Sequence, residues 1–432
     1  MPSTNTSNLN LEKPADGEQS GEWGDTINSN MELIDAAVAT KTGSETLTNK
    51  TLTSPVLNTG VSGTAVKDEN NMASDSATHL ATQQSIKAYA DSVSNTKNRI
   101  DNPSGVINQR GAQTGLVNGW VADRWYFGTL SPSVVSTNTV SGFIEVDVTT
   151  VDTSIVAGDY AYLQQSIEGF NTSDLLIGTA SARTITISFK HKHTKTGINC
   201  VALTNGLANR SYIFEYTQSV SNTEESHSET VTLDTAGTWY GDTNATGLKI
   251  IFGAMSGTTY HGAADTWLAT NDFATSNQVN NMDSTSNFFR ITDVQIEEGT
   301  VATPLEYEHY EVTLAKCQRY LPVLRADTVD KVMGLMGMNY STTVSLLPHV
   351  FKVQPRSKIT GITVSAATDF SLTLANSGRQ VSTAIAFNAG FPDGVMLVVT
   401  VAANLVAGDA TTLWSAASGG DDALILFTGA EL

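Results

Sequence analysis

The chain has 432 residues and a net charge of −19, from 24 basic and 43 acidic residues. Such a chain, without a run of Lys or Arg, is unsuited to binding nucleic acid, because two polyanions repel each other. Charged residues make up only 16% of the chain, and no stretch has the apolar length of a membrane-spanning helix. We therefore expect several small domains, no nucleic-acid partner and no membrane insertion.

The composition also indicates a fold class and a compartment. Ser, Thr, Asn and Gly are abundant, and they suit the strands and turns of a mainly β protein. The two cysteines, Cys200 and Cys317, are too few for a disulfide framework. The polar start of the chain lacks the regions of a signal peptide. A chain with these features is expected to fold in a reducing cytoplasm.

Residues 1–40 are predicted to contain an amphipathic helix. Its apolar side chains recur every three or four residues and so share one helical face, which carries Trp23, Ile27, Met31, Ile34 and Val38. Two interpretations stay open. The face packs on its own chain, or it is a docking and self-association surface, since no neighbouring apolar segment is available to cover it.

Residues 41–105 are predicted to form a fibre shaft or connector. The first part is poor in apolar residues and holds Pro55, so it is either a disordered linker or part of a core that three chains share. A helix is predicted from Thr82, as N-cap, to Ile100. Its coiled-coil spacing of four and three residues is carried by Ile86, Ala90, Val93, Lys97 and Ile100, with the lysine interrupting the seam.

Strands dominate the rest of the chain. Residues 142–148 and 183–190 alternate apolar and polar side chains, and further short strands follow between turns, which predicts a jelly-roll β-sandwich over residues 106–310. Residues 310–320 are predicted to be a short helix that ends before Pro322. Strands then return, so residues 311–432 are expected to hold a linker helix and a small C-terminal β-domain.

Several stretches resemble the sequences of bacteriophage tail fibres. They are WGDTIN at 23–28 with Ile34 and Asp35, LTNKTLTSP at 47–55, DSATHLATQQSIKAY at 75–89 and the terminal GAEL. The segment FFRITDVQIEEG at 288–299, followed by ATPLE and CQRY, resembles the end of a carbohydrate-binding-module-like jelly roll of such fibres. The resemblance implies a virion tail protein made in the host cytoplasm. It also implies a homotrimer, attachment to other tail or adaptor proteins through the N-terminus, and a sugar-containing host receptor.

Sugar binding needs flat apolar faces and fixed polar groups, which aromatic rings and polar side chains supply. Trp125 lies in an apolar strand and is expected to be core. Aromatic residues in loops are better ligand candidates, namely Trp239, Tyr240, Tyr260 and Trp267. Packing in the core or between subunits is the alternative role for each. On this basis receptor binding should depend on loop aromatics rather than on charge.

No catalytic motif or zinc-spaced cysteine pair is present, so we expect neither an enzyme nor a cofactor. Jelly-roll modules often hold a structural calcium ion, for which Asp123 and Asp293 are weak candidates beside the alternative that both are surface acids. His191 and His193 are expected on a solvated strand face.

The sequence thus predicts a non-enzymatic tail-fibre adhesin that binds host surface polysaccharide by multivalent contacts. A structural adaptor that holds another receptor-binding protein is the first alternative. A polysaccharide-degrading tailspike is the second.

Overall fold

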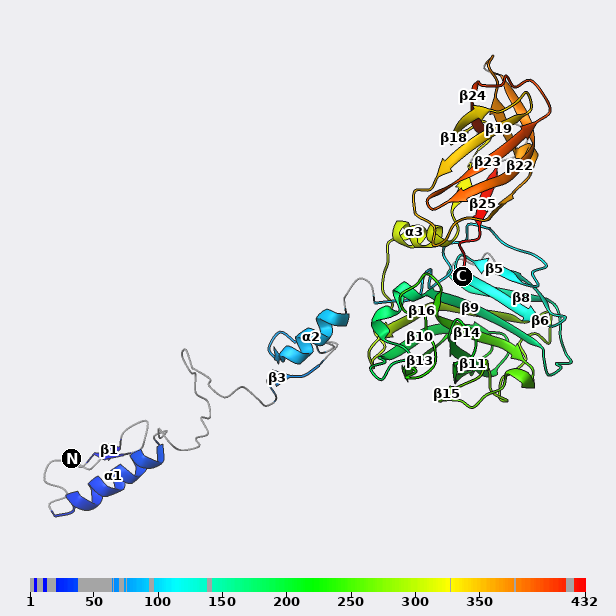
Figure 1. The fold of residues 1–432 in the computed structure, drawn as a ribbon. Coiled ribbons are helices and arrows are strands. Elements are labelled where there is room, and N and C mark those ends of the chain that lie inside the picture. The colour runs from blue at the N-terminus through cyan, green and yellow to red at the C-terminus, as the bar shows by residue number, and fades with distance from the viewer. Residues whose placement is uncertain are drawn as a thin grey trace. The chain divides into compact units, whose positions relative to one another are not determined.

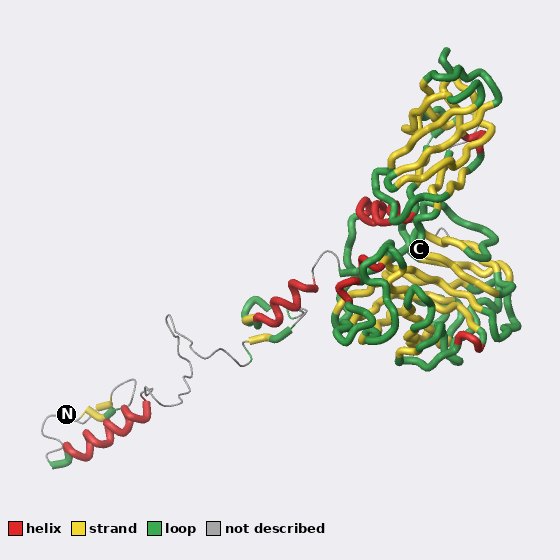
Figure 2. Tube along the Cα trace, in the orientation of Figure 1, coloured by secondary structure: helices red, strands yellow, loops and turns green. Residues whose placement is uncertain are grey.

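The computed structural model describes residues 4–5, 11–13, 21–37, 64, 66–69, 74, 76–92, 97–137, 142–326, 328–376, 378–416 and 423–432. The chain divides into two compact units, Met1–Ile86 and Lys87–Leu432. It is mainly β, as predicted, and Figure 2 shows strands throughout the second unit. None of the helices in the described ranges has both the length and the apolar run that crossing a membrane requires.

The first unit holds one long helix and short strand pairs. These are α1 (Trp23–Ala37), the pair β1 (Thr4–Asn5) with β2 (Glu12–Lys13), and the parallel pair β3 (Val66–Lys67) with β4 (Leu80–Ala81). On α1, the predicted apolar face is largely exposed, at 50% for Trp23, 51% for Ile27 and 60% for Met31. Ile34 is half-buried, and Val38 lies outside the described residues.

The second helix, α2 (Gln83–Ser92), begins as predicted, with Thr82 at its N-cap. The Thr82 Oγ1 accepts a hydrogen bond from the backbone N–H of Ser85 at 3.1 Å. Ile86 is exposed, and Val93 lies outside the described residues.

The prediction that this helix continues to Ile100 is wrong. The backbone N–H of Arg99 donates to the carbonyl of Ile296 at 2.9 Å, and the Asn98 Oδ1 accepts from the N–H of Ile296 at 3.1 Å. This segment therefore runs along a strand of the sandwich. Ile100 is buried in the sandwich core instead of lying on a coiled-coil seam.

Two antiparallel sheets form a β-sandwich in the second unit (Figure 1). The five-stranded sheet has the order β13-β10-β16-β8-β7, and the seven-stranded sheet has the order β15-β12-β11-β14-β9-β6-β5. The first consists of β7 (Val134–Thr137), β8 (Ile144–Thr150), β10 (Thr184–His193), β13 (Glu225–Thr232) and β16 (Phe288–Glu298). The second consists of β5 (Gly119–Ala122), β6 (Trp125–Leu130), β9 (Tyr160–Glu168), β11 (Gly197–Thr204), β12 (Ser211–Gln218), β14 (Thr246–Ser256) and β15 (Trp267–Leu268).

The main core fills the space between these sheets. Alternate residues of a strand point to opposite faces, and the inward residues of both sheets pack together. Trp125 and Phe127 of β6 are fully buried there, as predicted for Trp125. Three 3-10 turns, η1 (Gly169–Asn171), η2 (Ser173–Leu175) and η3 (Thr258–Tyr260), lie in the loops.

The C-terminal part begins with α3 (Tyr310–Tyr320), at the predicted position. Six strands then close into a barrel in the order β18-β19-β23-β22-β21-β24. They are β18 (Val332–Asn339), β19 (Val344–Val350), β21 (Phe370–Thr373), β22 (Arg379–Phe391), β23 (Gly394–Val401) and β24 (Ala410–Ser415). A three-stranded sheet adjoins them, formed by β17 (Val323–Arg325), β20 (Gly361–Val364) and β25 (Leu424–Thr428), and η4 (Ala367–Asp369) precedes β21. This barrel has its own apolar core.

Candidate functional site

The seven-stranded sheet has one face against the core and one face turned away from the five-stranded sheet, here called the outer face. Strand β9 shows the alternation. Ala161 and Leu163 belong to the main core, whereas Tyr160 and Tyr162 pack with a separate small cluster that includes Phe273. The outer face is therefore built by the residues that alternate with the core positions.

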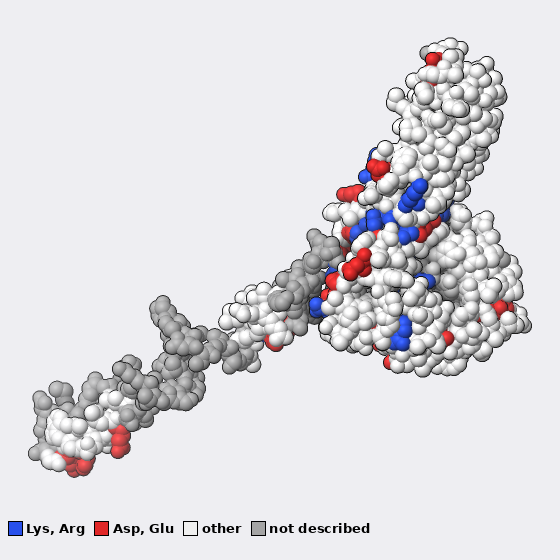
Figure 3. All heavy atoms as spheres, in the orientation of Figure 1, with Lys and Arg blue, Asp and Glu red and all other residues white. Residues whose placement is uncertain are grey.

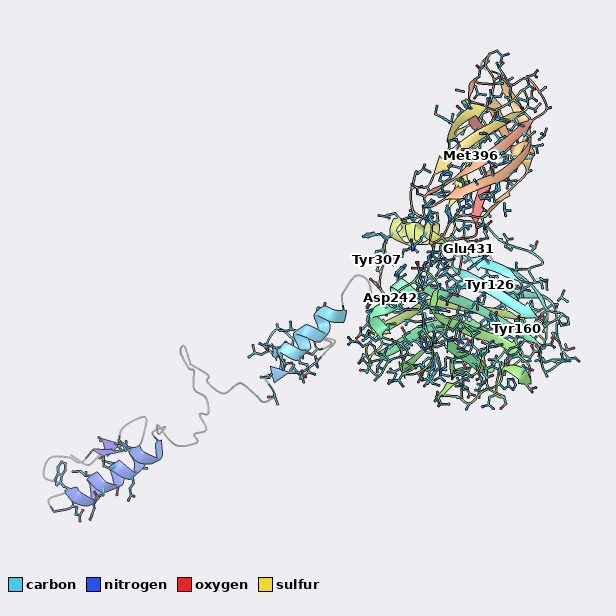
Figure 4. All side chains as sticks on the ribbon, viewed as in Figure 1. Tyr126, Tyr160, Asp242, Tyr307, Met396 and Glu431 are labelled. Carbon is cyan, nitrogen blue, oxygen red and sulfur yellow. The ribbon has the colours of Figure 1, made fainter. Side chains whose placement is uncertain are left out.

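Aromatic side chains gather on this outer face. Trp120 of β5 stands opposite Tyr126 of β6, and the two rings meet edge to face with centroids 5.3 Å apart. The rings of Tyr160 and Tyr162 stack at 5.3 Å, and Tyr260 meets Tyr160 edge to face at 5.3 Å. All five side chains are half-buried. They form the aromatic row, defined as Trp120, Tyr126, Tyr160, Tyr162 and Tyr260, and Figure 4 labels Tyr126 and Tyr160 on this sheet.

Two glycines leave space for the Tyr162 ring in the middle of the aromatic row. Tyr162 has Gly128 opposite it on β6 and Gly253 opposite it on β14. A Cβ atom on Gly128 would lie 2.7 Å from ring carbons of Tyr162. The tyrosine ring therefore lies across the neighbouring strand in space that any larger residue would occupy.

Two phenol groups of the row, those of Tyr126 and Tyr160, are held in their protonated form. Burial raises the pKa of Tyr126, and burial with the neighbouring phenols Tyr260 and Tyr126 raises the pKa of Tyr160. Each phenol thus keeps an O–H donor beside a flat ring. This pairing of a ring face with a hydroxyl donor suits a ligand that has both C–H surfaces and hydroxyl groups.

Polar groups continue the outer face beside the aromatic row. Gln164 of β9 lies between Tyr126 on β6 and Ile251 on β14. Lys249 of β14 stands opposite Ser166 of β9 and is half-buried. Burial lowers the pKa of Lys249.

The end of the outer face next to the C-terminal part is closed by ion pairs. The Arg110 guanidinium lies 5.5 Å from the centre of the Trp120 ring, and its Nη2 pairs with Glu431 at 2.5 Å. Glu168, the last residue of β9, accepts hydrogen bonds from Arg319 and from the Tyr320 hydroxyl. These carboxylates are therefore occupied by cations or hydroxyl groups of the protein itself.

The structure separates the four predicted sugar-binding residues. Trp239 and Trp267 meet edge to face at 5.6 Å and pack against the main core. Their indole N–H groups donate to the carbonyls of Ala236 and Thr232, at 3.0 and 2.9 Å. Both tryptophans thus have structural partners at the β12–β15 edge, which is the alternative role that the sequence left open.

The other two predicted residues lie in different places. Tyr260 belongs to the aromatic row and also packs on Phe273, with ring centroids 5.0 Å apart. Tyr240 is half-buried, and its carbonyl comes close to Gly169 and Gly247. Only Tyr260 of the predicted set is therefore part of the outer face.

The two candidate calcium ligands also have protein partners. Asp123 is buried and accepts a hydrogen bond from the backbone N–H of Gln109 at 3.0 Å. Asp293 pairs with Lys190 at 3.0 Å and accepts from the Ser104 hydroxyl at 2.8 Å. Within the described ranges, no group of three or more His, Cys, Asp or Glu side chains is placed to hold a metal ion.

The prediction that His191 and His193 lie on a solvated strand face is wrong. Their exposed fractions are 1% and 0%, because this face of β10 meets the seven-stranded sheet. The His191 Nδ1 is 2.9 Å from the Gln218 Oε1, and the His193 Nε2 is 2.8 Å from the Tyr216 hydroxyl. Both rings are therefore hydrogen-bonded members of the sandwich interior.

The outer-face aromatics Trp120 and Tyr126 were missed by the preference for aromatics in loops. The order Trp125-Tyr126-Phe127 in the sequence could have indicated which way Tyr126 points. If Trp125 and Phe127 are core residues of one strand, Tyr126 must point to the opposite face. The sequence could not show whether that opposite face is covered.

Fold and face together define a two-sheet β-sandwich with an aromatic outer face, joined to a small barrel. No protein-family model matches the chain, and no curated protein matches it. Solved structures resemble it weakly. A structure described as "CBM4 structure and function" is 14% identical over 46% of this chain and 99% of that chain, with a TM-score of 0.27.

Two further solved structures have similar values. A family 11 carbohydrate-binding module from Clostridium thermocellum, in complex with a β-1,3-1,4-mixed-linked tetrasaccharide, is 14% identical over 44% of this chain and 99% of that chain, with a TM-score of 0.22. The enzymatically active domain of tailspike protein 4 of bacteriophage CBA120 is 14% identical over 51% of this chain and 23% of that chain, with a TM-score of 0.23. Likenesses at this level leave the ligand of this chain undefined.

Proposed function

We propose that this chain is a non-enzymatic adhesin of a phage tail fibre, and that it binds a host surface glycan on the outer face of the seven-stranded sheet. The aromatic row carries this proposal. Half-buried rings such as Trp120 and Tyr126 offer flat surfaces to the C–H side of a pyranose. Gln164 and the phenol groups offer hydrogen bonds to its hydroxyls. The tail-fibre role itself rests on the sequence resemblance.

Binding without cleavage is part of the proposal. Glycoside hydrolysis generally uses two carboxyl groups that face the scissile bond. At the end of the outer face, Glu168 and Glu431 are each paired with an arginine, Arg319 and Arg110. Release of reducing ends from host polysaccharide by the purified chain would instead support the tailspike alternative.

The experiment is glycan binding by the full-length chain and two tyrosine variants. Tyr126→Ala removes a ring of the row, and Tyr307→Ala removes one that is 85% exposed away from the sandwich sheets. Tyr126→Ala should weaken binding several-fold, since each aromatic contact contributes roughly 0.5–1.5 kcal/mol beyond the burial of area. Tyr307→Ala should bind normally. Equal binding by both variants would remove the outer face as the site and favour the adaptor alternative.

Multivalent binding requires several chains in one particle, and we propose a homotrimer. A surface on the C-terminal barrel supports self-association. Strands β18, β19 and β23 contain no Lys, Arg, Asp or Glu, and Figure 3 shows the visible side of this barrel almost free of charged side chains. The outward side chains of this surface, here called the barrel face, are Met336, Met338, Leu346, Pro348, Met396 and Val398.

Register makes the barrel face continuous. Met338 pairs with Leu346, which pairs with Val398 on the next strand, while Pro348 pairs with Met396. Met336 is 69% exposed. Antiparallel sheets with one solvated face usually alternate apolar and polar residues, so strands that are apolar on both sides are typical of a sheet covered on both sides.

A second copy of the chain is the partner that fits. Two chains that each carry −19 repel each other, and a charge-free surface is where this repulsion is least. The barrel face is three residues long on three strands, a footprint of about 140 Å² from strand spacings of about 4.8 Å and rises of about 3.3 Å. A standard interface buries about 800 Å² per partner, so we expect the exposed face of α1 to add contact area.

Light scattering on the full-length chain tests this assembly. The unmodified chain should be a trimer, and Met338→Lys combined with Leu346→Lys should yield smaller species, because the charges would be buried without partners. Val301→Lys, at an exposed site after β16, is the matched control. A monomeric unmodified chain, or a trimer that survives the double substitution, would contradict the role of the barrel face.

A further inference from the structure

Lys249 is an isolated cation on the outer face. Its neighbours across the sheet are Ser166 on β9 and Thr204 on β11, so it extends from the middle of the sheet rather than from its edge. Core residues Leu248 and Ile250 flank it along β14, which directs its side chain outward. Lys249 therefore stands on the same face as Tyr126 and Gln164.

Several other half-buried cations of the second unit have carboxylate partners. Such pairs join Arg210 to Asp234, Arg290 to Glu145, Lys195 to Asp283 and Arg319 to Glu168. In the described part of the chain, Lys249 has no such ion pair, and burial is the single cause of its lowered pKa. Desolvation of a cation without a compensating anion is unfavourable. A lysine on an open surface would avoid this desolvation by extending its ammonium group into water.

Lys249 thus differs from the paired cations, because no carboxylate among the described residues offsets the cost of burying its charge. A bound anion would restore to the Lys249 ammonium group a favourable interaction that burial has removed. The lack of a carboxylate partner within the described ranges leaves the Lys249 ammonium group available to an anionic group of a ligand.

We propose that the glycan bound on the outer face is acidic, and that Lys249 binds a carboxylate of a uronic-acid or similar sugar while Tyr126 stacks on a sugar ring. This inference rests on the proposed function of the outer face. Two strand spacings, about 10 Å, separate β6 from β14, so stacking and ion pairing would involve adjacent sugar units. An acidic ligand would supply the counter-charge that no described residue provides to Lys249.

Long-range electrostatics work against such a ligand, because the chain carries −19. At physiological ionic strength the Debye length is about 8 Å, so distant charges are screened whereas a direct ion pair in a half-buried position is screened much less. Lys249 would therefore act by selecting acidic sugars after contact and not by steering them from a distance.

The test compares acidic oligosaccharides with their neutral counterparts. The probes are oligogalacturonate, hyaluronan fragments and alginate fragments, each with its carboxyl-reduced form, measured by calorimetry with the full-length chain at physiological salt. The unmodified chain should bind at least one acidic probe about tenfold more tightly than its reduced form. Lys249→Met should lose this preference and should bind the reduced form within about twofold of the unmodified chain.

Two further measurements separate a binding role from a structural one. Lys249→Met should unfold at a higher temperature than the unmodified chain, because a desolvated, unpaired charge has been replaced by an apolar side chain of similar length. Lys192→Met removes a charge from β10 in the other sheet and should leave the preference unchanged. A lower unfolding temperature for Lys249→Met than for the unmodified chain would overturn the assignment. An equal loss of the preference for acidic probes in Lys192→Met would also overturn it.

The outcomes distinguish this inference from the proposed function. Binding of neutral sugars without any preference for the acidic forms would overturn the role of Lys249 and leave the outer face as the site. Absence of binding to every acidic and reduced probe, together with normal cell adsorption by Tyr126→Ala, would overturn both. Phosphorylated oligosaccharides form a last arm, and a preference for phosphate over carboxylate would contradict the uronic-acid assignment.

Discussion

Glu168 at the end of β9 accepts two hydrogen bonds from Arg319 of α3, with Oε1–Nη2 and Oε2–Nε distances of 2.6 and 2.9 Å. The carboxylate is 1% exposed, and Tyr320 also donates to it at 3.0 Å. The guanidinium of Arg124, which is paired with Asp101, lies 3.4 Å from the centre of the Tyr320 ring. This network attaches α3 to the end of the outer face.

Arg319→Met should destabilise the chain by about 3 kcal/mol, because it leaves a buried carboxylate without its cation. Adding Glu168→Gln should recover part of this loss, since the uncompensated charge is then removed. Urea denaturation of both variants measures the difference. A double variant that is less stable than Arg319→Met alone would contradict the account.

Trp267→Ala should lower stability without changing glycan binding per folded molecule. The ring packs against the main core and contacts Tyr212 at 5.3 Å, and truncating a large, partly buried aromatic removes about 2 kcal/mol or more. Thermal unfolding and glycan affinity are measured on the same samples. Normal stability with weakened binding would return Trp267 to the ligand site that the sequence suggested.

The sandwich should lose stability in mild acid. Burial lowers the pKa of His191, His193 and His227, and the charge of His191 lowers that of His193 further. The unfolded chain therefore binds more protons below about pH 6.5, and the free energy of unfolding falls as the pH falls from there. Each histidine lowers the free energy of unfolding by at most about 1.4 kcal/mol for each unit by which the pH falls.

Carboxylates whose pKa is raised by burial act in the opposite sense, namely Asp123, Asp147, Glu229 and Glu431. Burial, together with the charge of Glu145, raises the pKa of Asp147 to about 6, so this group favours the folded state as the pH falls from about 6 toward 4. Between pH 7.5 and 5.5 the three histidines should outweigh these carboxylates, because ordinary carboxyl pKa values lie at about 4. The unfolding temperature should drop between pH 7.5 and 5.5, and it should drop less for His191→Gln. A temperature that does not depend on pH in this range would refute the histidine account.

Gly128→Ala should weaken glycan binding and reduce stability by about 1–3 kcal/mol, the range for adding a group to a packed site. The new methyl group would meet the Tyr162 ring, which must then shift from its present stacked position on Tyr160. Gly158→Ala, where a Cβ atom meets nothing within 4 Å, is the control. Unchanged binding by Gly128→Ala would show that the position of the Tyr162 ring is irrelevant to the ligand.

Deletion of residues 1–40 should abolish incorporation into virions and leave the sandwich and barrel folded. The apolar face of α1 that carries Trp23, Ile27 and Met31 is largely exposed, and exposed apolar faces are typical of docking surfaces. Particle association of the truncated chain is measured beside its circular dichroism. Normal incorporation would assign attachment to another part of the chain.

Local patterns were sufficient for much of the fold. Alternation predicted strands such as β8 and β10, the Thr82 cap placed the start of α2, and α3 lies where a short helix was expected. The buried position of Trp125 followed from its apolar strand. These features depend on neighbours within a few residues, which the sequence displays directly.

Tertiary structure decided the features that depend on which face of a strand is covered. A period of two residues separates Tyr126 from Trp125, and His191 from Lys192, but it does not tell which side meets another sheet. The sheet order buried His191 and left Tyr126 on the outer face, which also carries Lys249 from a distant strand. Pairing of the 97–100 segment with β16 likewise drew Ile100 into the core instead of a helical seam. Such outcomes arise from contacts between residues far apart in the chain, whose free energies exceed local preferences.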